Sequence, residues 1–294
     1  HHAYSVEEPY FSMYDIKKIK PYVHALPENA PLPLLKMREI RTGKYAKEED
    51  FSRIQSVYYG MITKLDTLIG KILNEIRNQD LFGNSIIMFW VDHGDFAGQY
   101  DLVEKWDTAM EDCIMHVPQI IYSSELPQGH IVESLTGHTD IAPTILELLG
   151  IKPQKGWLFH GESLIPIIKG EKKKIAVFPN GGHEDEMLKR VNRNIFDIRK
   201  DRKVVPANQG KQSVYEQYPE TMSHTKMIRT EKWKLLIRLS GGNELYDIEN
   251  DPKEMKNLYS DPSYEKTISE LMLKMNEWCL RTDTDRPYQE NVGA

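Results

Sequence analysis

Apolar residues recur at steps of three and four from Glu48 to about Gln79, which places them along one broad face of a helix. Asn78 and Gly83 mark the exit from this pattern. Before it, residues 21–33 carry four prolines, a composition that predicts an extended and irregular segment. The pattern therefore predicts one long amphipathic helix. Its apolar positions are Phe51, Ile54, Val57, Tyr58, Met61, Ile62, Leu65, Leu68, Ile69, Ile72, Leu73 and Ile76.

The periodicity changes at residues 86–91, which are continuously apolar. Such a run is typical of a strand covered on both faces, as in a parallel sheet with helices above and below. A short helical segment near 108–113 and a second apolar run at 118–122 follow, and residues 139–150 predict a helix that stops at Gly150. The order predicts the α/β class, with a mixed, largely parallel sheet flanked by helices.

Beyond about residue 170 the pattern becomes that of short antiparallel strands, at 175–180, 225–239 and 243–248. An amphipathic helix is expected from 264 to about 279. Residues 185–218 are charged and lack periodic apolar positions, so we expect a long loop there. The sequence thus predicts two domains, an α/β layer over 1–170 and a small α+β subdomain over 171–294.

Composition excludes several classes of protein. Of the 294 residues, 40% are hydrophobic and 28% are charged, which is enough for a sizeable core. The net charge of −6 does not indicate a nucleic-acid-binding surface. No apolar stretch approaches the roughly 20 residues that span a bilayer, and the first residues have no signal-peptide pattern. Cys113 and Cys279 are too few for a disulfide framework and lie in no metal-ligand spacing.

Candidate chemistry begins directly after the first predicted strand, with Asp92 and His93. Ligands of an open α/β sheet bind beyond the carboxyl ends of its strands. A carboxylate and an imidazole there can turn toward one divalent cation, with Gly94 relaxing the backbone and Asp95 nearby. The alternative is an acid that caps the following loop and a histidine that packs.

A lysine, Lys105, follows a loop that contains glycines, and the whole string DHGDFAGQYDLVEKWDTAMEDCIMHVPQII resembles the motif that closes the active site in the sulfatase family of the alkaline phosphatase superfamily. The resemblance extends upstream to YYGMITKLDTLIGKIL and downstream to TGHTDIAPTILELLGI and GESLIPIIKG. It continues through MIRTEKWKLLIRL and ELYDIENDPKEMKNL. It implies that 1–170 is the C-terminal part of a sulfatase catalytic core and that 171–294 is the family's C-terminal subdomain.

By position, the resemblance implies that Asp92 is a metal-ligating carboxylate, that His93 takes a place where the family has asparagine or histidine, and that Lys105 contacts the sulfate oxygens. The opening HHAY is similar to the family's PHxPY segment, whose histidine contacts the scissile ester oxygen. His1 is the match and His2 the alternative, unless both belong to an affinity tag. A cation and a lysine would neutralise sulfate charge, and a histidine would protonate the leaving alcohol.

The family's nucleophile, a formylglycine made from a C/S-x-P/A-x-R motif, has no counterpart here, because neither Cys113 nor Cys279 lies in that motif. The resemblance therefore implies a C-terminal portion of a sulfatase that is inactive alone toward sulfate esters. The implied cofactors are one divalent cation, Ca²⁺ before Mg²⁺, and a formylglycine in the N-terminal part.

The expected substrate is a sulfate ester of a glycan, and His183 and His224 are candidates for the mouth of the pocket, unless they are ordinary surface or packing histidines. Two rival functions stay open: a phosphonate monoester or phosphodiester hydrolase of the same superfamily, and a catalytically inactive sulfatase-like binding protein. The lack of an N-x-S/T sequon favours a bacterial origin. The sequence does not indicate the oligomeric state or the cellular compartment.

Overall fold

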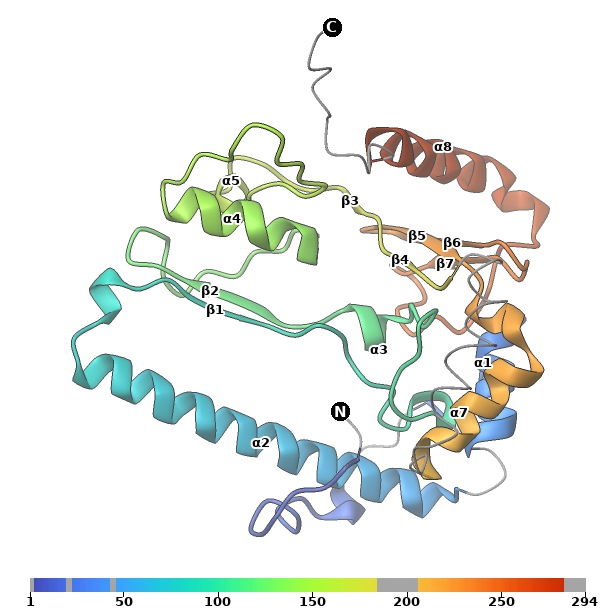
Figure 1. The fold of residues 1–294 in the computed structure, drawn as a ribbon. Helices are drawn as coiled ribbons and strands as arrows, with labels where there is room; N and C mark the ends of the chain where they lie inside the picture. The colour runs from blue at the N-terminus through green and yellow to red at the C-terminus, as the bar shows by residue number, and fades with distance from the viewer. Residues whose placement is uncertain (1–2, 20–22, 43–45, 184–205, 283–294) are drawn as a thin grey trace, which may run out of the picture.

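The computed structural model describes residues 3–19, 23–42, 46–183 and 206–282, which form two sheets with helices around them (Figure 1). The helices are α1 (Leu32–Met37), α2 (Glu48–Asn78), α3 (Asp112–Met115), α4 (Ile141–Leu148), α5 (Ile165–Ile168), α7 (Pro206–Gln217) and α8 (Glu265–Thr282). The strands are β1 (Ile87–Trp90), β2 (Gln119–Tyr122), β3 (Ala176–Val177), β4 (Asn180–Gly181), β5 (Thr225–Thr230), β6 (Trp233–Arg238) and β7 (Glu244–Asp247). A π-helical turn, Arg38–Thr42, continues α1.

The long helix predicted from the apolar spacing is α2, and its bounds agree with the prediction. Three acidic residues occupy its first turn, where they complement the positive end of the helix dipole. Its N-terminal half packs closely, since a Cβ at Gly60 would lie 2.2 Å from the backbone oxygen of Tyr10. Farther along, Ile62, Leu65 and Ile72 are exposed. No helix in the described ranges is long and apolar enough to cross a membrane.

The first sheet consists of β1 and β2, and it does not have the parallel pairing expected for residues 86–91. The two strands pair antiparallel, with Ile87 opposite Tyr122 and Trp90 opposite Gln119. The physical reason is the connection: the chain between them contains a folded-back loop and the short α3, whereas a parallel return usually takes a long helical crossover. Every other pairing between named strands is also antiparallel.

The second sheet has the order β3-β5-β6-β7, with β4 also paired to β5, and it confirms the antiparallel strands predicted beyond residue 170. Side chains alternate between its two faces. On one face, Ile228 and Leu235 pack against Met275 of α8. On the other, Met227 and Leu236 pack against Met110, in the segment that follows the end of β1. The sheet therefore connects α8 with the region of Asp92 and Lys105.

Helix α7 corrects the long loop expected over 185–218. Residues 185–205 lie outside the described part, but Pro206–Gln217 is helical. Its Val214 is fully buried in a cluster with Leu34 and Met37 of α1 and with Trp106. A helix with so short a buried stripe leaves no apolar period in the sequence, and tertiary packing stabilises it instead. The division at residue 170 stays a prediction.

Candidate active site

The end of β1 holds the two predicted metal ligands. Asp92 is exposed, with 84% of its side-chain surface accessible, whereas His93 is largely covered. His93 Nδ1 lies 2.7 Å from the carbonyl oxygen of Gly94, which can only accept, so Nδ1 donates. In the neutral imidazole Nε2 then carries a lone pair, and it lies 3.4 Å from Asp92 Oδ2. Two acceptor atoms side by side, one on a histidine fixed by a backbone carbonyl, are an arrangement that suits a cation.

Two contacts fix this strand end. The Gly94 amide donates to the Ile114 carbonyl at 2.7 Å, and a Cβ at position 94 would lie 2.0 Å from the carbonyl oxygen of Cys113. Glycine is therefore required sterically, because any side chain would push the strand end away from α3. His138 Nε2 donates to the Val91 carbonyl at 2.8 Å. This second histidine at the strand end was not predicted from the sequence.

Asp95, considered in the sequence as a nearby ligand, is held through one of its two carboxylate oxygens. It is buried, and its Oδ1 accepts from the Tyr4 hydroxyl at 2.6 Å, the Ala97 amide at 2.8 Å and the Glu104 amide at 3.0 Å. Across the described ranges, no group of three or more His, Cys, Asp or Glu side chains is arranged to hold a metal ion. Asp92 and His93 thus fit part of a ligand set, because divalent cations of this type take six or more donors.

Lys105 is carried back to the strand end by the loop 95–104. The Phe96 amide donates to the Glu104 carbonyl at 3.1 Å, while the Glu104 amide donates to Asp95. These bonds place Lys105 next to the residues that follow Asp92 and His93. The loop is unusual in its backbone, because four non-glycine residues have positive φ: Ala97, Tyr100, Asp101 and Glu104.

Of the other predicted site residues, His183 lies near the segment that follows Lys105, and His224 lies elsewhere. His183 follows β4, and its Nε2 lies 3.2 Å from Asp107 Oδ2, two residues after Lys105. His224 instead lines an apolar cavity of about 180 Å³ between the second sheet and α8, with Met275 and Cys279 among its other walls. His1 lies outside the described residues, so its catalytic role stays a prediction.

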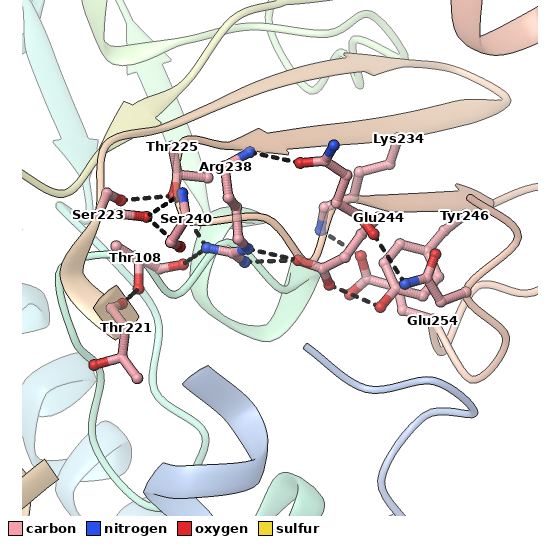
Figure 2. A network of polar contacts seen from close by, with 12 residues as sticks. Thr108, Thr221, Ser223, Thr225, Lys234, Arg238, Ser240, Glu244, Tyr246 and Glu254 are labelled. Carbon is pink, nitrogen blue, oxygen red and sulfur yellow. Dashed lines mark hydrogen bonds and ion pairs between the residues drawn. The ribbon is translucent and has the colours of Figure 1, made fainter. Parts of the chain in front are cut away.

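A buried polar network supports the segment that follows Lys105 (Figure 2). Arg238 Nη1 donates to the Thr108 carbonyl at 3.3 Å, and Arg238 Nη2 pairs with Glu244 Oε1 at 2.6 Å. The Tyr246 hydroxyl donates to the other Glu244 oxygen at 2.8 Å. The network thus ties β6 and β7 to the segment that follows Lys105. Sequence reasoning missed it, because charged residues in strands are normally expected on a solvated face.

Next to this network, the Lys234 ammonium lies between Asp112 Oδ1, at 2.9 Å, and Glu254. Burial alone would lower the pKa of Lys234, but the two carboxylates outweigh it and the pKa is raised. Glu111 is buried beside the same carboxylates. Burial, followed by the charges of Glu244 and Glu254, raises its pKa to about 7.

Comparison with known proteins places this geometry in a family. The family model described as Sulfatase matches residues 21–151. The model described as N-sulphoglucosamine sulphohydrolase, C-terminal, matches residues 193–280. The chain belongs to the sulfatase family.

Curated relatives of this sulfatase-family chain come from animals and bacteria. Arylsulfatase K of Gallus gallus is 28% identical over 220 residues, which cover 74% of this chain and 35% of the relative. N-acetylglucosamine-6-O-sulfatase of Bacteroides thetaiotaomicron is 25% identical over 241 residues, which cover 80% of this chain and 36% of the relative. The chain therefore spans about a third of the length of these relatives.

Solved structures show the same fold. A phosphonate monoester hydrolase of Agrobacterium radiobacter superposes with a TM-score of 0.72 at 22% identity, covering 95% of this chain and 54% of that one. A 2-O GAG sulfatase superposes with a TM-score of 0.66 at 23% identity, covering 91% and 54%. The alkaline-phosphatase/sulfatase-like architecture expected from the motif resemblance is confirmed.

Proposed function

We propose that the protein containing this chain hydrolyses a sulfate ester of a glycan, and that this chain supplies the cation ligands Asp92 and His93 and the anion-binding Lys105. The observation that carries the proposal is the strand end, where Nε2 of His93 lies 3.4 Å from Oδ2 of Asp92. Hydrogen bonds between Glu104 and residues 95 and 96 hold the backbone before Lys105 against residues that are close in sequence to Asp92 and His93, which supports a place for the lysine in the same site. Two relatives are sulfatases by name, one acting on N-acetylglucosamine.

Each residue has a role that follows from its chemistry. A bound divalent cation, for which we propose Ca²⁺ with Mg²⁺ as the alternative, would draw negative charge from the sulfate oxygens. Lys105 pairs with another of these oxygens as a compact point charge. His1, or His2 in its place, donates a hydrogen bond to the leaving alcohol. The attacking group is proposed to be a formylglycine in polypeptide that precedes this chain, so the chain alone is expected to be inactive.

His183 is the better of the two candidates for contact with the sugar. It lies beside Asp107, two residues after Lys105 in the sequence, whereas His224 faces the cavity under α8. The His183–Asp107 pair can offer both a donor and an acceptor to sugar hydroxyls. We therefore propose that substitution of His183 affects the choice of glycan and that substitution of His224 does not.

The experiment that tests the function is release of inorganic sulfate by the full-length gene product from sulfated N-acetylglucosamine and from 4-nitrophenyl sulfate, with and without prior chelation of divalent cations. We expect turnover that chelation abolishes and Ca²⁺ restores. Absence of sulfate release from every sulfated substrate, in a protein that carries a C/S-x-P/A-x-R motif, would contradict the proposal.

Phosphonate monoester hydrolysis is the second candidate, favoured by the superposition on two such hydrolases at TM-scores of 0.72 and 0.71. At 22% and 19% identity these superpositions support the fold alone. A catalytically inactive binding protein becomes the better proposal if the preceding codons encode no nucleophile motif. The relatives come from both animals and bacteria, so the bacterial origin stays a prediction.

A further inference from the structure

The residue before Lys105 combines two unusual features. Glu104 is only 4% exposed, although it is a carboxylate, and its φ of 63° lies in the left-handed region that favours glycine. A buried charge and a strained backbone at one position are retained only when the surroundings determine them. The contacts of Glu104 show what the surroundings are.

Two cationic side chains from distant segments converge on the Glu104 carboxylate. Arg41, in the π-helical turn after α1, pairs with Oε2, and both side chains are 5% exposed. Lys211 of α7 pairs with Oε1 at 3.3 Å. Close packing of α7 on the turn makes this convergence possible, because a Cβ at Gly210 would lie 3.1 Å from the Cα of Arg41.

The same side chains also bind the backbone on both sides of Glu104. Arg41 Nη1 donates to the Val103 carbonyl at 2.9 Å, and Lys211 Nζ donates to the Lys105 carbonyl at 2.8 Å. The Glu104 amide donates to Asp95. Three consecutive residues, 103, 104 and 105, are therefore each held by a side chain from elsewhere in the chain.

We propose that Glu104 is a positioning residue for Lys105: with Arg41 and Lys211 it fixes the left-handed turn from which the Lys105 side chain reaches the sulfate oxygens. The proposal rests on the function proposed above for Lys105. Glu104 itself does not touch the substrate. A charge placed by a rigid backbone stabilises an anion without reorganising during the reaction, and displacement of such a group by about 1 Å can lower a rate by about 100-fold.

The test is a double-mutant cycle in the full-length gene product, with Glu104→Gln, Lys105→Ala and the double variant. Glu104→Gln keeps the size of the side chain but removes its charge. The matched control is Glu7→Gln, which removes one partner of an exposed ion pair with Lys64. The readout is kcat/KM for 4-nitrophenyl sulfate, with thermal unfolding measured for each variant.

If Glu104 acts through Lys105, we expect Glu104→Gln to lower kcat/KM by about 10-fold or more with Lys105 present, and by less than about two-fold in the Lys105→Ala background. Glu7→Gln should leave kcat/KM unchanged. An equal loss in both backgrounds, or no loss in either, overturns the proposal. A second, independent cycle combines Lys211→Met with Lys105→Ala, because Lys211→Met removes the hydrogen bond from Lys211 Nζ to the Lys105 carbonyl.

A readout without catalysis separates failure of the positioning from failure of the proposed function. Hydrogen exchange of the amides of residues 103–105 should be faster in Glu104→Gln than in wild type, and unchanged in Glu7→Gln. Faster exchange together with no hydrolysis of any sulfate ester by wild type would refute the function but retain the rigid turn. Unchanged exchange refutes the positioning itself.

Discussion

Replacement of Glu111 by glutamine should remove a pH dependence of folding. Glu111 is 8% exposed, and its Oε2 has no hydrogen-bond partner within the described part of the chain. Burial and the neighbouring Glu244 and Glu254 raise its pKa from 4.5 to about 7. The folded protein therefore holds a proton on Glu111 at pH values where the unfolded chain has released it.

The sign and the size follow from this difference. Between pH 4.5 and about 7 the folded state binds more protons than the unfolded state, so the free energy of unfolding falls as the pH rises through this window. From 4.5 to about 7 the pKa rises by about 2.5, which at about 1.4 kcal/mol per pKa unit corresponds to at most about 3.5 kcal/mol. Above about pH 7 the contribution of Glu111 to the free energy of unfolding no longer changes with pH.

Urea unfolding of wild type and Glu111→Gln at pH 5 and at pH 8 measures this effect. We expect the glutamine variant to gain stability relative to wild type on going from pH 5 to pH 8, by about 1–3 kcal/mol. Glu133→Gln is the control, because Glu133 is exposed and should change neither value. An identical pH dependence in wild type and Glu111→Gln would refute the burial of a neutral carboxyl at this position.

Three further substitutions test other parts of the structure. Asp92→Asn should weaken Ca²⁺ binding at least about tenfold in calorimetry on the full-length protein, and an unchanged affinity would exclude Asp92 as a ligand. Leu235→Ala, in the fully buried core between the second sheet and α8, should cost about 2–5 kcal/mol in urea unfolding, whereas a loss below about 1 kcal/mol would contradict that packing. Gly182→Ala should lower Tm, because φ there is +80° and the new Cβ would lie 2.3 Å from the Ser223 oxygen; an unchanged Tm would argue against this backbone.

The sequence predicted elements whose stabilising contacts are periodic. The hairpin of β5 and β6 buries side chains at regular spacing, whereas α2 buries Phe51 and Val57 and leaves later apolar positions such as Ile72 exposed. Both elements formed within a few residues of the predicted bounds. Helix α7 was missed because its burial depends on one valine, Val214, and on packing against α1. Periodicity also could not predict that β2 runs antiparallel to β1, because an apolar run does not indicate the direction of the strand it pairs with.

The polar contacts of the candidate site were also only partly predictable from the sequence. Asp92, His93 and Lys105 were predicted because a strand end and a family motif place them, although their roles remain proposals. The groups that hold Lys105, above all Arg41 and Lys211, are 64 and 106 positions away from it in sequence. No local pattern connects them, since only the tertiary fold brings three segments to one carboxylate.

The most direct test of the account compares Lys105→Ala with wild type in the full-length gene product, on 4-nitrophenyl sulfate and on an aryl phosphodiester. We expect wild type to prefer the sulfate ester, and Lys105→Ala to lower kcat/KM for it about 100-fold, which is typical of removing one charge-stabilising donor. A preference for the phosphodiester, or full sulfatase activity without Lys105, would contradict the claim that this chain supplies the anion-binding side of a sulfatase site.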